Sequence, residues 1–162
     1  MSLYDDVFRA LADAHVRYVV VGGVAVVLRG HARLTVDLDL VLDLERDNAT
    51  RAVDAILSCG LLPRLPVDAH LFADPEIRAG WVANRNLMVF SFYDPDDPVR
   101  VLDVFAEEPM PFAELADAAD DIALDEARVR VASVRDLIAM KRAAGRPKDL
   151  EDIAALERMM EP

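Results

Sequence analysis

Two aspartates separated by a single residue, Asp37 and Asp39, are the side chains whose type and spacing best suit chemistry. Successive residues of a strand point to opposite faces, so residues 35, 37, 39 and 41 are predicted to share one face. Residues 36, 38, 40 and 42 are all aliphatic and are expected to form the buried face. The two carboxylates then lie about 7 Å apart on the side of a cleft or solvent, which suits one or two Mg²⁺ or Mn²⁺ ions.

Asp103 is a third candidate acid, because it interrupts an apolar run over residues 99–105. Strand alternation places its charge partly against hydrophobic groups unless a metal ion or a cation compensates it. It is either a metal-site carboxylate or a structural aspartate on an edge strand, paired with an arginine such as Arg100 or Arg33. The sequence leaves both interpretations open.

Gly22 and Gly23 follow a β-branched run over residues 18–21 and are expected to turn the chain there. A short helix is predicted over residues 24–28, and a second strand is predicted to begin at Arg33. The local order is therefore strand, glycine turn, helix and strand, with the paired acids in the second strand.

The formal net charge of −12 argues against a general nucleic-acid binder, because phosphate backbones are held by clustered positive charge. The segment 135–148 is an exception: five basic residues stand there against the single acid Asp136, and both lysines of the chain, Lys141 and Lys148, lie in it. A compact, mobile ammonium suits a phosphate contact. Chance clustering is the alternative.

The periodicity of the remaining residues predicts alternating helices and hairpins. Helices are expected over residues 3–11, 48–59 and 75–86, and strands over residues 87–93, 99–105, 122–124 and 129–131. Asp47 or Asn48 is the expected cap of the second helix. The last two strands form a small hairpin whose predicted turn contains Asp125 and Glu126.

Two helices are predicted at the end of the sequence. A capping box beginning at Ser133 opens the first, and Gly145 ends it. Pro147 fits the first turn of the second, which has an inner stripe predicted at residues 150, 153, 156 and 160.

A length of 162 residues predicts one domain with a substantial core. There is no apolar run long enough to span a bilayer and no basic leader segment, so we expect a cytoplasmic protein without a membrane partner. The single cysteine, Cys59, is interpreted as a buried thiol rather than a disulfide or metal ligand.

The order and spacing of these motifs resemble the DNA polymerase beta-like nucleotidyltransferases, in particular the AbiEii-type toxin group and the minimal nucleotidyltransferases. The residues that carry the resemblance are Gly22-Gly23, Arg33-x-Thr35-x-Asp37-x-Asp39 and Asp103. Segments 136–141 and 146–152 are similar to the lysine-containing C-terminal helices of that toxin group. The matches run from about residue 18 to about residue 156.

The resemblance implies an α/β (α+β) fold: a mixed β-sheet flanked by helices over residues 1–132, followed by a C-terminal helical pair over residues 133–162. It also implies that Asp37, Asp39 and Asp103 bind the Mg²⁺ or Mn²⁺ ions, and that Asp103 helps to draw the proton from the attacking hydroxyl.

By the same resemblance, Gly22 and Gly23 bring backbone amides close to the triphosphate of an NTP substrate. Lys141 is the expected triphosphate contact, with Asp149 orienting it, although a snorkelling lysine is an equally weighted alternative. Arg33 and Thr35 are expected to add contacts to the phosphates or to Asp37.

The function implied is metal-dependent transfer of a nucleotide to an RNA such as tRNA, a protein or a small molecule. The resemblance also implies the toxin of a toxin-antitoxin pair with an antitoxin partner. Many active members of the resembled group carry serine where this chain has Gly23, so a catalytically weak nucleotide- or partner-binding module is the alternative. A Mg²⁺ phosphohydrolase or nuclease with the same acids is a third, less favoured reading.

Overall fold

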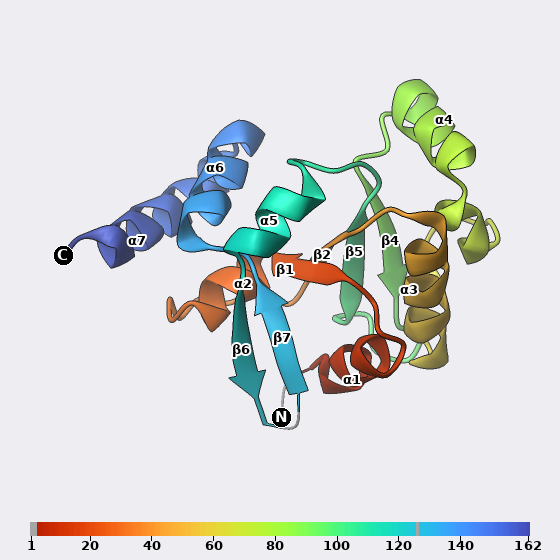
Figure 1. Ribbon diagram of the computed structural model, residues 1–162, viewed down its shortest axis with the longest axis horizontal. Helices are drawn as coiled ribbons and strands as arrows, with labels where there is room; N and C mark the ends of the chain where they lie inside the picture. The colour runs from red at the N-terminus through yellow and green to blue at the C-terminus, as the bar shows by residue number, and fades with distance from the viewer. Residues whose placement is uncertain (1–2, 126) are drawn as a thin grey trace.

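The computed structural model describes residues 3–125 and 127–162. At its centre lies a seven-stranded mixed sheet with strand order β3-β4-β5-β2-β1-β7-β6 (Figure 1). Its strands are β1 (Tyr18–Val21), β2 (Leu38–Leu42), β3 (Leu62–Pro63), β4 (Val89–Tyr93), β5 (Val101–Phe105), β6 (Asp120–Leu124) and β7 (Ala127–Val131). The predicted mixed sheet is confirmed.

Helices flank this sheet, and the last two pack against each other at one end of the molecule (Figure 1). They are α1 (Asp5–Asp13), α2 (Gly22–Leu28), α3 (Arg46–Ser58), α4 (Pro75–Arg85), α5 (Phe112–Ala118), α6 (Val134–Ala144) and α7 (Leu150–Met160), with 3₁₀ turns over Ala69–Ala73 and Pro147–Asp149. In the described ranges, none of these helices combines the length and the apolar character that crossing a bilayer requires.

Both predicted hairpins are present. β4 and β5 pair antiparallel, as do β6 and β7, although Glu126 of the predicted second turn lies outside the described residues. The centre of the sheet joins strands distant in sequence: β1 pairs antiparallel with β2 and parallel with β7, and β2 pairs parallel with β5. One face of β2, β4 and β5 is fully buried, through Leu38, Leu40, Phe90, Phe92 and Leu102.

The second strand begins at Leu38 rather than at the predicted Arg33. Its pairing with β1 ends where Val21 meets Asp39, because the chain turns into α2 at Gly22. Residues before Leu38 therefore have no ladder partner on that side and follow an irregular path. The prediction that Val36 is a core residue is wrong, since it is 38% exposed.

The helix boundaries also differ in detail from the prediction. Glu45, not Asp47 or Asn48, caps α3, because its carboxylate accepts hydrogen bonds from the first free amides. Ser133 and Gly145 cap α6 as predicted. The predicted inner stripe of α7 is wrong at its ends, where Leu150 and Met160 are exposed.

Candidate active site

Three side chains form a row across adjacent strands of the sheet. Ser91 of β4 is in register with Asp103 of β5, and Asp103 is in register with Asp39 of β2. Neighbouring strands lie about 4.8 Å apart, so the two carboxylates are adjacent. Alternation puts this row opposite the fully buried face, and both acids are half-buried.

Asp103 accepts a hydrogen bond of 2.5 Å from the Ser91 hydroxyl. The arginines suggested as its alternative partners are engaged elsewhere: Arg100 pairs with Asp6 and Asp94, and Arg33 pairs with Asp152. Neither arginine therefore forms the edge-strand ion pair with Asp103 that was the alternative interpretation.

Asp39 has a perturbed proton affinity. Burial is the largest cause that raises its pKa to about 7, followed by the negative charges of Asp103 and Asp37. Arg146 and Lys141 act in the opposite direction but do not cancel the rise. Asp39 therefore stands within electrostatic reach of two other acids and two cations, at a point with excess negative charge.

Asp37 lies just before β2 and not on it, so the predicted shared strand face of Asp37 and Asp39 is wrong in detail. Its side chain is exposed at the rim, beside the irregular segment over residues 31–37. In the described part of the chain, no three His, Cys, Asp or Glu side chains converge closely enough to hold a metal ion by themselves. The three acids are neighbours without forming a closed cage.

This arrangement nevertheless fits a divalent cation. Mg²⁺ is usually bound through one or two carboxylates together with substrate phosphates, rather than by a cage made wholly of protein. Adjacent Asp39 and Asp103 provide the carboxylates, and the raised pKa of Asp39 reflects charge that a cation would compensate.

Gly22 and Gly23 stand against this site, and both must be small. Gly22 begins α2 with φ at +67°, and a Cβ added there would lie 2.0 Å from Asp39 Oδ2. A Cβ on Gly23 would lie 2.4 Å from Thr35 Oγ1. The glycines therefore let Asp39 and Thr35 pack directly against the start of α2. The expected turn is this helix start itself, since α2 begins at Gly22 rather than at residue 24.

A cluster of opposite charges lies where α6 and α7 meet. Lys141 is 5% exposed, and its Nζ lies 3.1 Å from Asp149 Oδ1 and 2.8 Å from Asp152 Oδ2. Arg146 donates to Asp149, with Nε 2.7 Å from Oδ2, and Arg33 pairs with Asp152. We call these five residues the Lys141 cluster.

Charge pairing in the Lys141 cluster outweighs the effect of burial on the pKa of Asp149. Burial alone would raise the pKa of Asp149, but hydrogen bonds from Arg146 and Lys141 outweigh it and lower that pKa. The Lys141 side chain does not snorkel to solvent, because Nζ is held between two buried carboxylates. Its contact with Asp149 has the geometry expected of an orienting acid, while its role toward a nucleotide stays a prediction.

Sequence reasoning missed Ser91, Arg146 and Asp152 as site residues. Asp152 follows Asp149 by three positions, so both lie on one side of a helical turn, and this spacing was a usable signal. Ser91 gave no signal, since its position depends on strand register.

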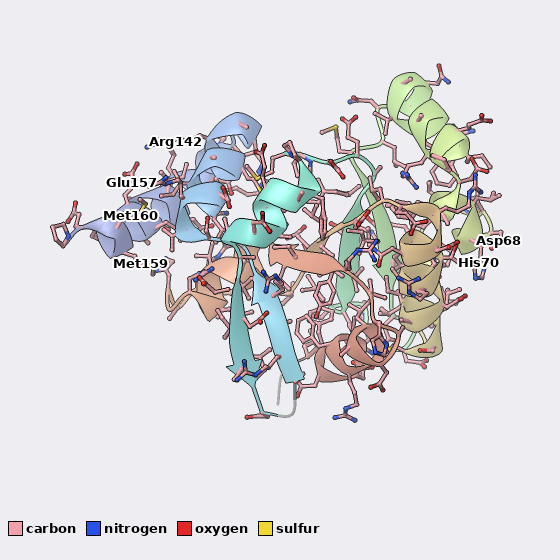
Figure 2. All side chains as sticks on the ribbon, in the orientation of Figure 1. Asp68, His70, Arg142, Glu157, Met159 and Met160 are labelled. Atoms are coloured by element: carbon pink, nitrogen blue, oxygen red, sulfur yellow. The ribbon has the colours of Figure 1, made fainter. Side chains whose placement is uncertain are left out.

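Arg142 and His70 form ion pairs outside the site. Arg142 pairs with Glu157 across α6 and α7 (Figure 2). His70 bonds Asp54 and Asp68, on the opposite side of the molecule from Arg142 (Figure 2). The basic segment is thus partly a set of structural ion pairs, and its contribution to the site is Lys141 and Arg146.

The fold and these acids beside a glycine helix start define a nucleotidyltransferase. The family model described as "Nucleotidyl transferase AbiEii toxin, Type IV TA system" matches residues 6–162. The chain belongs to this AbiEii nucleotidyltransferase family. A comparison with curated proteins gave no match.

Solved structures of similar fold are also nucleotidyltransferases or like them. ANT(2")-Ia in complex with adenylyl-2"-tobramycin is 16% identical, with a TM-score of 0.64 over 98% of this chain and 88% of that one. A nucleotidyltransferase-like protein from Paracoccidioides brasiliensis is 16% identical, with a TM-score of 0.56 over 97% of this chain and 75% of that one. These identities establish the likeness of fold alone.

Proposed function

We propose that this nucleotidyltransferase is metal-dependent and transfers a nucleoside monophosphate from an NTP to an acceptor hydroxyl. The observation that carries the proposal is the position of Asp39: it lies beside Asp103 and against Gly22, with Lys141 and Arg146 within electrostatic reach. An acidic group and a basic group therefore lie within electrostatic reach of each other.

The charges of the Lys141 cluster and of the three acids together match a nucleoside triphosphate with its divalent ion. In the Lys141 cluster, three cations stand against two carboxylates, which leaves one positive charge for a phosphate. Asp37, Asp39 and Asp103 contribute three negative charges when ionised. A polyphosphate suits the first group and a cation suits the second.

Asp39 and Asp103 would hold the divalent ion, with Asp37 at the rim. Such an ion stabilises the charge that develops on the entering and leaving oxygens of phosphoryl transfer. Ser91 donates a hydrogen bond to one oxygen of Asp103, which leaves the second oxygen for ligand and acceptor.

The chain's residues then act on the acceptor and the nucleotide. Asp103 receives the acceptor proton as the acceptor oxygen bonds the α-phosphorus, and the bond from the α-phosphorus to the bridging oxygen breaks. Pyrophosphate leaves with that bond's electron pair. Lys141 and Arg33 stabilise its charge, and the amides of Gly22 and Gly23 approach the phosphates.

Thr35 supports turnover despite the absence of a serine at position 23. Its Oγ1 would lie 2.4 Å from a Cβ on Gly23, so a hydroxyl already occupies the space beside that glycine. We propose that Thr35 contacts a phosphate oxygen. The catalytically weak binding module is the second candidate, and it would bind NTP without transfer.

The family description supports a proposal about the partners of this protein, and the acceptor is proposed with it. We propose a toxin of a type IV toxin-antitoxin system that acts on an RNA end such as tRNA, with a cognate antitoxin. Protein hydroxyls and small molecules are the other acceptor classes. The solved complex of ANT(2")-Ia contains an adenylylated tobramycin, which makes aminoglycoside hydroxyls a specific small-molecule case to assay.

The test is an incubation of the protein with each α-labelled NTP, Mg²⁺ and either total tRNA, cell extract or tobramycin. Label transferred to an acceptor is expected, and Asp39→Asn or Asp103→Asn should lower it by at least about 10³-fold, as removal of a catalytic ligand does. Asp121→Asn is the matched control, since this strand aspartate pairs with Arg130 far along the sheet. NTP binding without transfer would favour the second candidate, and free phosphate or cut strands would indicate hydrolysis.

A further inference from the structure

Tyr4 lies between the two chain segments that carry the acids Asp37 and Asp103. It precedes α1 and is 2% exposed. Its hydroxyl is 2.5 Å from the Val36 carbonyl oxygen and 2.6 Å from the Val101 carbonyl oxygen. The Val101 N–H donates back to the same hydroxyl at 3.1 Å.

The chemistry of this hydroxyl makes it a persistent anchor. A phenol has one proton, which the two carbonyls share, and its oxygen accepts the Val101 amide hydrogen. Burial is the main reason that the pKa of Tyr4 is raised to about 12, so the hydroxyl stays protonated at neutral pH.

The aromatic ring is held in place from its other side. The Arg100 guanidinium lies 5.9 Å from the ring centroid of Tyr4. Arg100 is itself paired with Asp6 of α1 and with Asp94, which follows β4. The hydroxyl thus projects from a ring that is fixed to both α1 and the β4–β5 hairpin.

The segment anchored by Tyr4 lacks the support that a strand would give. β1 ends opposite Asp39, so residues 36 and 37 have no ladder partner on the β1 side. Val36 is next to Asp37, and Val101 lies two residues before Asp103 on β5. One hydroxyl therefore fixes the backbone beside each of two acids that come from different parts of the chain.

We propose that Tyr4 is a positioning residue, whose hydroxyl sets Asp37 relative to Asp103 so that Asp37 lies at the rim of the divalent-ion site that Asp39 and Asp103 form. The inference rests on the proposed function. It assigns Tyr4 no contact with the substrate, because the hydroxyl is occupied by backbone groups.

The test is Tyr4→Phe, which removes one oxygen and keeps the ring. Two readouts are used: turnover with saturating NTP, and Mn²⁺ binding followed by electron paramagnetic resonance without nucleotide. We expect kcat to fall about tenfold and the Mn²⁺ dissociation constant to rise about fivefold, the scale of one buried hydrogen bond. At saturating Mg²⁺, KM for NTP should stay unchanged, because the Lys141 cluster is untouched.

Tyr18→Phe is the matched control. Tyr18 is a second buried tyrosine, on β1 at the end opposite to the residue that pairs with Asp39. It should leave kcat and Mn²⁺ binding at wild-type values. Equal effects of the two substitutions, or wild-type Mn²⁺ binding in Tyr4→Phe, would overturn the inference.

The two proposals fail in different ways. If the wild-type protein transfers no label to any acceptor, the proposed function fails, while a weaker Mn²⁺ affinity of Tyr4→Phe would still support the anchor. If Tyr4→Phe does not fold, the anchor is tested instead by amide hydrogen exchange of the wild-type protein. Protection of the Val101 amide equal to that of other β5 amides supports the anchor, and exchange at the rate of an open loop overturns it.

Discussion

Asp39 is the residue in which fold stability and function conflict most directly. A half-buried carboxylate beside two others is unfavourable when ionised, and the pKa of Asp39 is accordingly raised to about 7 by burial and by Asp103 and Asp37. Active sites commonly carry such perturbed groups, because the ligand's charge later compensates them. The same residue therefore lowers stability without ligand and enables cation binding.

This conflict gives a prediction about pH. Because the folded pKa of about 7 lies above the ordinary 3.8, the folded protein binds more protons between these values, and stability falls as pH rises through that window. Asp39→Asn removes the effect. At pH 8 without divalent ions the variant should be more stable than wild type, and this advantage should shrink by about 2–4 kcal/mol on going to pH 4.

Denaturant unfolding of both proteins at a series of pH values measures the difference, with EDTA present. Asp121→Asn, an exposed aspartate in β6, serves as control and should track wild type at each pH. A constant difference between wild type and Asp39→Asn across pH would contradict the raised pKa.

Gly22 supports a second residue-scale prediction. Gly22→Ala combines a positive φ with a Cβ placed 2.0 Å from Asp39 Oδ2, so Asp39 must move. Gly60→Ala is matched in backbone strain, with φ at +81°, but meets no atom within 4 Å. Gly22→Ala should cost about 1–3 kcal/mol more than Gly60→Ala in unfolding free energy.

The same pair separates strain from site geometry in the transfer assay. Gly22→Ala should abolish detectable transfer because Asp39 is displaced, whereas Gly60→Ala should retain wild-type turnover. Equal turnover of the two variants would mean that the approach of Asp39 to Gly22 is not needed for activity.

At the scale of elements, the hairpins and most helices could be predicted because their signals are local. The loop between β4 and β5 contains two prolines, which mark it as a turn. Ser133 caps α6, the helix that begins at the next residue. The start of β2 could not be predicted, because it depends on where β1 leaves the sheet. The register of Ser91 with Asp103 is likewise set by pairing between strands and not by either strand's own residues.

The Arg33–Asp152 ion pair joins the segment before β2 to α7, and it carries an element-scale prediction. Asp152 is buried and is shared between Arg33 and Lys141. A double-mutant cycle with Arg33→Gln and Asp152→Asn should give a coupling of about 1–3 kcal/mol in unfolding free energy.

A second ion pair on the same helices provides the control cycle. Arg142 and Glu157 join α6 to α7 through side chains that are 63% and 45% exposed (Figure 2). Their cycle should give less than about 1 kcal/mol, because solvent screens an exposed pair. Coupling of the same size in both cycles would show that Asp152 does not hold Arg33 more firmly than a surface contact would.

At the scale of the whole molecule, the site is made of parts far apart in sequence. Asp39 and Asp103 lie on the adjacent strands β2 and β5 and the glycines begin α2, whereas Lys141 lies in α6 and Asp149 in the 3₁₀ turn before α7. The order of motifs was enough to predict this class of fold. The contact of Lys141 with Asp149 was expected from the resemblance. The further pairing of Asp152 with Arg33 was not predicted, because it joins the segment before β2 to α7, which are far apart in the sequence.

A ligand that touches both parts should stabilise them together. Mg²⁺ alone meets carboxylates without phosphates, and NTP alone faces three acidic charges near Asp39. The two ligands should therefore act cooperatively. At about 100 times the dissociation constant, Mg²⁺ with NTP should raise Tm by about 5–10 °C, whereas either one alone should raise it much less.

Two variants separate the contributions of sheet and helices to this thermal shift. Asp39→Asn should make the shift caused by NTP independent of Mg²⁺. Lys141→Met should remove the response to NTP, and it is expected to fold because Arg146 still pairs with Asp149 and Arg33 with Asp152. Asp121→Asn should respond as wild type does. Only a ligand shared by the acids and the Lys141 cluster makes the effect of NTP depend on the cation. An equal Tm increase with NTP in EDTA and in Mg²⁺ would therefore show that the two groups do not bind one ligand.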